Sequence, residues 1–323
     1  MKLLILKTLA QLYVIVLAAN RFTWLFRSSW KANVPVISVG NILAGGTGKT
    51  PIVQWLVSKL INKGYRPLVV SRGYGSFNGE GDETILHRIK NTGCIAVSGA
   101  NRRQAIESVV EDYDVILLDD GFQHKRVFRD LDIVLVDATR DFLDEKMLPL
   151  GLLREQKFSL KRADIIICTH AQIKDDTLVK AIQKYSHGVD GWCEHYWKSL
   201  LVFDYGTRLE KNNSWLSEKE VVIRAGIGQP NHFTSIANRF GANIKHVCNV
   251  KDHSPFTERE ISYLKKLPCK TILMTEKDYI KFPEKYKKDF CLVVPDLGVR
   301  FLHSLEDLVF QKIIEESGLK KLN

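Results

Sequence analysis

Short apolar runs, many of them β-branched, recur along the first two hundred residues, with longer polar and charged stretches between them. They lie at residues 34–39, 66–71, 113–118, 132–137 and 163–168. The stretch after the first run, residues 51–63, has the apolar spacing of an amphipathic helix. Strands of this kind that alternate with helices are typical of a parallel sheet with both faces covered. The pattern therefore predicts an α/β domain built on a parallel sheet.

A second and shorter α/β pattern follows a change of character near residue 196. Residues 200–203 are apolar enough for an extended connector, and the polar residues 210–214 suit a turn. Further apolar runs then predict a second, smaller sheet; they span residues 221–225, 271–274 and 291–294. The expected parts are a first domain at 31–195, a hinge at 196–219 and a second domain at 220–323.

The first thirty residues have a pattern of their own. Residues 3–19 are nearly all apolar, and Trp24, Phe26 and Trp30 follow among basic residues. As a helix this run would be about 26 Å long, just short of the hydrocarbon core of a bilayer. Its few polar residues share one face, and the aromatic and basic flank is typical of an interfacial segment. We expect residues 1–30 to form a membrane-associated helix that lies in one leaflet, with a spanning helix and a plain core helix as the alternatives.

Composition adds a preference for anionic partners. Of the 323 residues 45% are hydrophobic and 26% are charged, which is ordinary for a globular protein and excludes global disorder. The net charge of +10 favours a phospholipid, a phosphorylated substrate or a nucleic acid. The six cysteines stand far apart without a CxxC pair, which argues against a zinc site and fits reduced thiols in the cytoplasm.

The strongest chemical signal is Gly45-Gly-Thr-Gly-Lys-Thr50, which lies between a predicted strand and a predicted helix. Backbone N–H groups of such a loop bind phosphate oxygens, and the helix N-terminus adds positive partial charge. Lys49 is expected to bridge the outer phosphates, and the Thr50 hydroxyl to bind Mg²⁺. The strict motif has glycine where this chain has Leu43, which leaves the loop shape open. An ATP-binding loop belongs in the cytoplasm, so a secretory signal at the N-terminus is rejected.

Acidic residues follow two of the predicted strands. Asp119 and Asp120 come directly after the run 113–118, where a carboxylate would hold Mg²⁺ beside the phosphate loop; an ordinary Asp-Gly turn is the alternative. Asp82 and Glu83 lie beyond the second strand. A kinase needs carboxylates to orient the acceptor hydroxyl and to hold metal, but the spacing alone favours a solvated turn.

Several motifs occur together in one order. They are Val36-Ile-Ser-Val-Gly-Asn41, Gly45 to Pro51, Ser71-Arg-Gly-Tyr-Gly75, Gly81-Asp-Glu83, Asp119-Asp-Gly-Phe-Gln-His124, Leu153-Arg-Glu155, Asp252-His253 and Thr275-Glu-Lys-Asp278. This order closely resembles the tetraacyldisaccharide 4′-kinases, the lipid A kinases of Gram-negative bacteria, from the N-terminal helix to about residue 282. The family usually has Arg-Glu-Pro where this chain has Gln156 in the third place, which puts the local turn in doubt.

The resemblance implies that the γ-phosphate of ATP passes to the 4′-hydroxyl of a tetraacylated glucosamine disaccharide 1-phosphate, giving lipid IVA, with ATP and Mg²⁺ as cofactors. The implied catalytic residues are Asp82, His253, Lys49 and Arg102. The implied nucleotide contacts are Gly45, Gly46, Thr47, Gly48, Lys49, Thr50 and Pro51, with Thr275, Glu276, Lys277 and Asp278 on the adenine side, so that the cleft should close over ATP. The implied metal-site residues are Thr50, Glu83, Asp119 and Asp120. The implied substrate contacts are Asn41, Tyr74, His124 and Arg154. Taken alone, a histidine at position 253 before the capping box Thr257–Glu260 would be read as structural.

The positive charge then has natural targets in a phosphorylated lipid and an anionic leaflet. The implied location is the cytoplasmic face of the bacterial inner membrane, with a peripheral or monotopic attachment and a monomeric chain. No RNP-like aromatic cluster or Cys/His finger supports nucleic acid binding. Two rivals remain: a membrane-associated P-loop switch ATPase, which would hydrolyse ATP without a lipid acceptor, and a nucleotide-binding scaffold, for which Asp82 would be dispensable.

Overall fold

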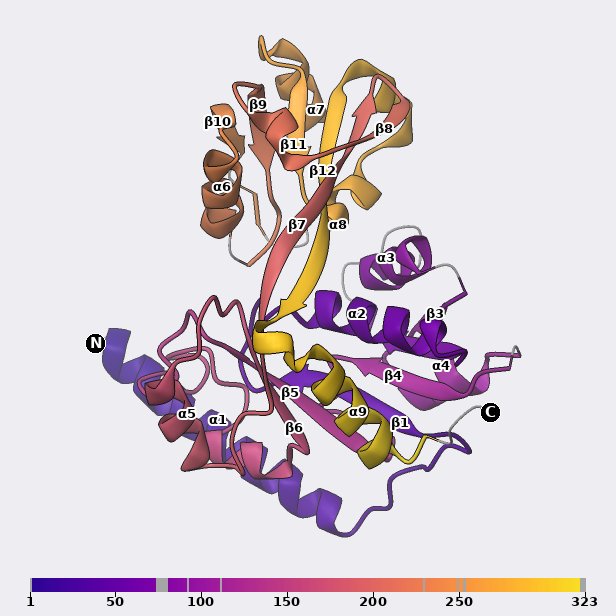
Figure 1. Ribbon diagram of the computed structural model, residues 1–323. Helices are drawn as coiled ribbons and strands as arrows, with labels where there is room; N and C mark the ends of the chain where they lie inside the picture. The colour runs from indigo at the N-terminus through magenta and orange to yellow at the C-terminus, as the bar shows by residue number, and fades with distance from the viewer. Residues whose placement is uncertain are drawn as a thin grey trace. The chain divides into compact units, whose positions relative to one another are not determined.

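The protein divides by its internal contacts into two compact units, each an α/β arrangement (Figure 1). The computed structural model describes residues 2–73, 81–91, 93–110, 112–228, 230–248, 250–251 and 254–319. The first unit comprises Met1–Arg72, His87–His195 and Val299–Asn323, and the second comprises Gly73–Leu86 and Tyr196–Gly298.

The first unit is built on a parallel sheet with the strand order β7-β6-β5-β1-β4-β2-β3. Its strands are β1 (Val36–Asn41), β2 (Pro67–Ser71), β3 (Ile95–Ser98), β4 (Val115–Asp119), β5 (Leu131–Asp137), β6 (Ile165–Thr169) and the start of β7 (Gly191–Asp204). Every residue of β1, β4 and β5 is buried, as expected for strands with helices on both faces. In the central register, Val39 of β1 lies opposite Asp119 of β4 and Ile133 of β5.

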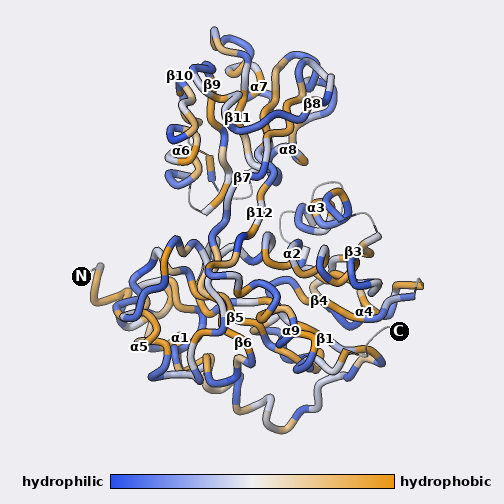
Figure 2. Tube along the Cα trace, in the orientation of Figure 1, coloured by the Kyte–Doolittle hydropathy of each residue, from blue (hydrophilic) through white to orange (hydrophobic). Residues whose placement is uncertain are grey.

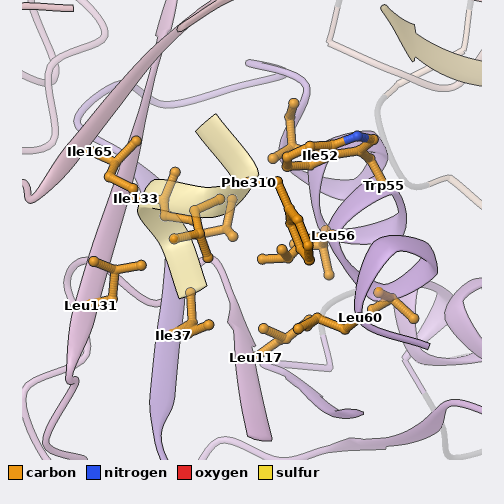
Figure 3. Packing of buried hydrophobic residues seen from close by; sticks show 14 of the residues in the cluster. Ile37, Ile52, Trp55, Leu56, Leu60, Leu117, Leu131, Ile133, Ile165 and Phe310 are labelled. Atoms are coloured by element: carbon orange, nitrogen blue, oxygen red, sulfur yellow. The ribbon is translucent and has the colours of Figure 1, made fainter. Parts of the chain in front are cut away.

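Two helices cover one face of this sheet. The apolar stripes of α2 (Lys49–Asn62) and α9 (Leu305–Ser317) bring Leu56 and Phe310 against strand residues such as Ile37 (Figure 3). The indole N–H of Trp55 donates to Glu306 at 2.8 Å and ties the two helices together. The opposite face packs against α4 (Arg102–Glu107), α5 (Asp176–Gln183) and the short helix η1 (Lys157–Arg162).

Helix α1 (Lys2–Leu25) lies on the first unit with most of its apolar side chains exposed. The Tyr13 hydroxyl donates to the carbonyl of Arg154 at 3.1 Å, and Lys125 donates to the side chain of Asn20 at 3.3 Å. Figure 2 shows the hydrophobic colour at the start of the chain. By length and composition, the segment Leu3–Trp24, 22 residues, is enough to cross a membrane. The helix is thus longer than the apolar run suggested, and its exposure contradicts the core-helix alternative.

The second unit has its own parallel strands in the order β10-β9-β11-β12, with β7 beside β12 and β8 antiparallel to β7. The strands are β8 (Thr207–Lys211), β9 (Glu220–Arg224), β10 (Asn243–Cys248), β11 (Thr271–Met274) and β12 (Cys291–Phe301). Its helices are α6 (Pro230–Arg239), α7 (Glu258–Lys266) and α8 (Glu276–Lys281). Helix α3 (Asp82–Lys90) begins in the second unit and ends in the first.

The division differs from the expected boundaries in three places. The expected hinge at 196–219 holds most of β7, all of β8 and the short helix η2 (Asn213–Leu216), because the exposed residues of β8 have no apolar periodicity. Residues 299–323 return to the first unit, because the apolar face of α9 packs on its sheet. Residues 73–86 belong to the second unit. The six cysteines are free.

Candidate active site

The loop between β1 and α2 has the conformation of a phosphate-binding loop. Gly45 and Gly48 have φ angles of 101° and 77°, a left-handed region that favours glycine. Gly48 caps α2, and the described residues form no side-chain cap at this helix end. The first N–H groups of α2 are therefore available to an anion, and the helix dipole favours negative charge there. Pro51 lies in the first turn, where its missing N–H has no cost.

The departure at Leu43 does not disturb this loop. Leu43 is buried in a cluster with Phe122 and Leu153, and it forms a backbone bridge with Leu153. Two further contacts brace the loop at Thr47. The amide of Asn41 donates to the Thr47 hydroxyl at 2.5 Å, and the Thr169 hydroxyl donates to the Thr47 carbonyl at 2.9 Å. The buried Leu43 side chain thus holds the base of the loop against the apolar cluster.

The acidic end of β4 faces the same loop. Lys49 lies 3.5 Å from one carboxylate oxygen of Asp120, and Arg154 donates to the other at 2.8 Å. Burial alone would raise the pKa of Asp120, but the charges of Lys49 and Arg154 outweigh it and hold that pKa below the usual value. Asp120 is therefore ionised beside the lysine that is expected to bind phosphate.

Asp119 has the properties of a metal ligand. Its side chain is 1% exposed, and one oxygen accepts a hydrogen bond from His87 at 3.1 Å if the His87 Nε2 carries the proton. The other oxygen is buried and has no hydrogen-bond partner among the described residues, which is costly for a carboxylate. The described ranges hold no cluster of three His, Cys, Asp or Glu that could bind a metal by itself. Mg²⁺ needs no such cluster, because it binds through one or two carboxylates together with water and phosphate oxygens, so Asp119 with Thr50 fits this ion.

Arg102 and His124 complete the first-unit site. The buried guanidinium of Arg102 donates to the carbonyls of Asp119 and Asp120 at 2.7 and 3.0 Å, so it fixes the backbone of the acidic turn. Burial, and then the charges of Arg102 and Arg129, lower the pKa of His124 to about 4. The His124 Nε2 is buried without a partner in the described part of the chain. A neutral imidazole with one open nitrogen is suited to a hydrogen bond with a substrate group.

The segment after Leu153 lies against the loop as well. Arg154 donates its backbone N–H to the carbonyl of Ile42 at 2.8 Å, and Glu155 accepts from Arg162 at 2.7 Å. Gln156 has a φ of −63°, which is the value that proline imposes. Glutamine, at the position where the resemblance implies proline, therefore has the backbone φ that proline would impose.

The remaining predicted residues gather in the second unit. Asp82 and Glu83 begin α3, and they pair with Lys281 and Lys277 of α8, each at 2.7 Å. Thr275 caps α8, and its hydroxyl contacts Asp278 at 2.7 Å. Asp278 also accepts from the N–H of Gly226 at 3.0 Å and pairs with the buried guanidinium of Arg224. Tyr74, Asp252 and His253 lie outside the described residues.

Comparisons with known proteins identify the family. The profile described as tetraacyldisaccharide-1-P 4′-kinase matches residues 2–314. The chain belongs to this family. It is 33% identical over 283 residues to the tetraacyldisaccharide 4′-kinase of Photobacterium profundum, covering 83% of this chain and 77% of that protein. It is 34% identical over 271 residues to the enzyme of Vibrio parahaemolyticus, covering 79% and 75%.

A solved structure of the same family supports the fold. The LpxK protein of Aquifex aeolicus, whose crystal structure is described as an apo form in complex with ATP, superposes with a TM-score of 0.72 at 25% identity. The match covers 98% of this chain and 99% of that one. The predicted fold class and the predicted kinase activity are confirmed. As a tetraacyldisaccharide 4′-kinase family member, the chain is a kinase of lipid A biosynthesis rather than a switch ATPase or an inactive scaffold.

Some residues of this candidate site had no signal in the sequence. His87 reaches Asp119, and the His195 ring fills the space beside Gly48, where an added Cβ would lie 2.1 Å from its Cε1. Each is a single histidine far from the loop in sequence, so no spacing could find it. Lys281 had a weak signal, because it follows Lys277 by four residues and so shares its helix face.

Proposed function

We propose that this kinase transfers the γ-phosphate of ATP to the 4′-hydroxyl of a tetraacylated glucosamine disaccharide 1-phosphate and so produces lipid IVA. The main support is the loop at Gly45–Thr50, with its open helix N-terminus, beside the partly unpaired carboxylate of Asp119. Membership of the family and the ATP complex of the Aquifex aeolicus relative point to the same nucleotide and the same class of lipid.

The first-unit residues have roles in binding and charge neutralisation. The backbone N–H groups at the start of α2 hold the phosphates, and Lys49 leaves Asp120 to bind the outer phosphates as negative charge accumulates there. Thr50, Asp119 and Asp120 would hold Mg²⁺, which neutralises charge on the phosphate oxygens when bound. Arg102 holds the backbone of the acidic turn through hydrogen bonds to its carbonyls. His124 and Arg154 contact the lipid headgroup, while Asn41 supports the loop through Thr47.

The second-unit residues act on the acceptor and on the nucleotide base. Asp82 aligns the 4′-hydroxyl and takes its proton as the bond to phosphorus forms, and His253 supports that carboxylate or takes the proton onward. Glu83 belongs to the metal site. Thr275 to Asp278 lies on the adenine side, with Thr275 and Asp278 maintaining its shape. Tyr74 contacts the substrate.

The proposed location is the cytoplasmic face of the inner membrane, with the chain as a monomer. The exposed apolar surface of α1 is compatible with membrane association. A positively charged protein is also attracted to anionic lipid, and this chain carries a net charge of +10.

The test is incubation of the protein with γ-labelled ATP, Mg²⁺ and the disaccharide 1-phosphate lipid, followed by chromatography. We expect a bis-phosphorylated lipid, and a loss of roughly a hundredfold in rate for Lys49→Ala, because a transition-state contact to phosphate is removed. The control is Lys63→Ala at the other end of α2. Release of free phosphate without labelled lipid would contradict the proposal and favour the switch ATPase.

A further inference from the structure

Lysine side chains of α8 hold both carboxylates at the start of α3. The Lys281 ammonium lies 2.7 Å from one oxygen of Asp82, and the Lys277 ammonium lies 2.7 Å from Glu83. The two lysines are four residues apart, so they lie on one face of α8. This pair of contacts joins α3 to α8 within the second unit.

The Asp82–Lys281 pair is far more buried than its neighbour. Asp82 and Lys281 are 0% and 3% exposed, whereas Glu83 and Lys277 are 17% and 21% exposed. Removing two charges from water has a desolvation cost that their attraction only partly offsets, so a buried ion pair is a poor source of stability. Its geometry has the clearer consequence, because a charge-assisted hydrogen bond fixes the direction of both groups.

The two oxygens of Asp82 are held in different ways. Oδ1 accepts a hydrogen bond from the backbone N–H of Glu83 at 2.9 Å, which is set by the helix itself. Oδ2 is held by Lys281, which comes from another element. The Asp82 carboxylate therefore has one contact from α3 and one from α8, and each contributes to its orientation.

Helix α8 is itself firmly anchored. Asp278, one residue after Lys277, accepts from the backbone N–H of Gly226 and from the Thr275 hydroxyl, and it pairs with Arg224. Arg224 is fully buried, and it also donates to Glu260 and to the carbonyl of Ser254. A lysine on such a helix has a fixed base from which to position a carboxylate.

We propose that Lys281 is a positioning residue that orients Asp82 for phosphoryl transfer. This inference rests on the proposed function, in which Asp82 aligns the acceptor hydroxyl. Without Lys281 the carboxylate keeps its backbone contact and loses the contact that α8 makes with Oδ2, so its direction is less restricted. A small error in the direction of a catalytic group lowers the rate strongly and leaves nucleotide binding intact.

The test compares Lys281→Met, Lys281→Arg, Asp82→Asn and the double variant Asp82→Asn/Lys281→Met in the full chain. We expect Lys281→Met to lower kcat on the order of a hundredfold, with the KM for ATP changed by less than about twofold. Lys281→Arg should recover at least about a tenth of wild-type kcat, because arginine also donates to a carboxylate. The double variant should be no slower than Asp82→Asn alone, since the two residues act as a unit.

A control variant and a hydrogen-exchange measurement separate the role of Lys281 from effects on folding and from the identity of the substrate. Lys265→Met is the matched control, because Lys265 also forms a 2.7 Å ion pair, with Asp289, but both side chains are 42% exposed. Hydrogen exchange of α3 without any ligand should quicken in Lys281→Met and stay unchanged in Lys265→Met. If Lys281→Met fails to fold, Lys281→Arg and the neutral double variant decide the question, because neither leaves an unpaired buried charge.

Several results would overturn the inference. They are a folded Lys281→Met protein with kcat within about threefold of wild type, losses that multiply in the double variant, or unchanged exchange in α3. Failure of the proposed function would give a different set of results from failure of this inference. The wild-type protein would then leave the disaccharide lipid unlabelled, while the exchange of α3 would still respond to Lys281→Met.

Discussion

Single residues at the phosphate loop are determined by the space around them. Gly48 combines a left-handed φ with direct contact to the His195 ring. The ring of His170 lies 4.6 Å from that of His195, and His170 pairs with Asp137 at the end of β5. Burial works against ionisation of Asp137, but its hydrogen bonds with His170 and Thr139 prevail and keep its pKa below the usual value. The His195 ring beside the loop thus comes from β7, and its neighbours come from the ends of β5 and β6.

Gly48→Ala should abolish ATP binding while the sheet still folds. The new Cβ would meet His195 at 2.1 Å, and the left-handed conformation would add about 1–2 kcal/mol of strain. We expect the Kd for ATP, measured by titration calorimetry, to rise at least about a hundredfold, which corresponds to about 3 kcal/mol. Gly93→Ala is the control, because Gly93 has a φ of 93° with no atom within 4 Å of an added Cβ. Equal affinity in both variants would mean that His195 yields to the methyl group.

His124 should make the folded protein less stable in mild acid. Its pKa is about 4 in the folded protein and 6.5 as an ordinary value, so the unfolded chain takes up a proton below about pH 6.5 that the folded protein refuses. The stabilisation is complete above that pH and is lost as the pH falls toward 4. Allowing for its partial exposure, we expect a loss on the order of 1–2 kcal/mol.

Denaturant unfolding of the wild type and of His124→Asn at pH 7.5 and 4.5 measures this contribution. The difference in unfolding free energy between the two proteins should shrink or reverse at the lower pH. An identical pH dependence in the two proteins would show that His124 takes up its proton equally in the folded and the unfolded states.

Helix α7 shows how local capping and long-range contacts share the residues at one helix end. Thr257 caps α7 by accepting from the N–H of Glu260, which is one half of the capping box that the sequence predicted. In a full capping box the Glu260 side chain would accept from the backbone N–H of Thr257. Here the Glu260 carboxylate accepts from Arg224 instead. Local propensity thus determines where α7 begins, and the buried arginine determines where its glutamate points.

Removal of α1 should separate membrane association from nucleotide binding. The cut belongs after residue 25, because the backbone of Trp30 bonds with Arg126 and Phe128 of the first unit. We expect the shortened protein to bind ATP normally and to lose most of its co-sedimentation with anionic vesicles, because the exposed apolar face of α1 is gone. Unfolding of the shortened protein would instead show that the contacts of α1 with Arg154 and Lys125 are needed for the fold.

A point variant sharpens that experiment. Ile15 on α1 is 63% exposed, and Ile173 on the first unit outside α1 is 76% exposed. Ile15→Glu should weaken vesicle binding, whereas the same change at Ile173 should have little effect. Equal loss in both variants would indicate that overall charge, not α1, governs the association.

The whole molecule distributes the proposed catalytic residues between its two units. Lys49, Arg102, Asp119 and Asp120 belong to the first, and Asp82 with Thr275 to Asp278 belongs to the second. β7 and β12 run through both units, and α3 carries Asp82 in one and His87 in the other. The chain therefore passes between the units more often than a linear division at residue 196 would allow.

The sequence by itself determined much of this protein. Alternating apolar strands established the parallel α/β architecture, and the order of motifs identified the family, because glycine, lysine and aspartate at a strand end have few other uses. For the candidate site it predicted residues whose chemistry can be inferred from neighbouring sequence, such as Lys49 and Asp119, and their roles stay predictions. The apolar run at residues 3–19 likewise indicated the exposed helix, although not its full length.

Only the tertiary structure decided which distant residues meet. His87, His195 and Lys281 contact predicted site residues that are far away in sequence. A single polar residue has no periodicity, so the sequence pattern could not predict these contacts. The return of α9 to the first unit depended on the same kind of long-range packing. Contacts of this kind arise when the chain buries its apolar faces, and the polar partners then follow from where the backbone has been brought together.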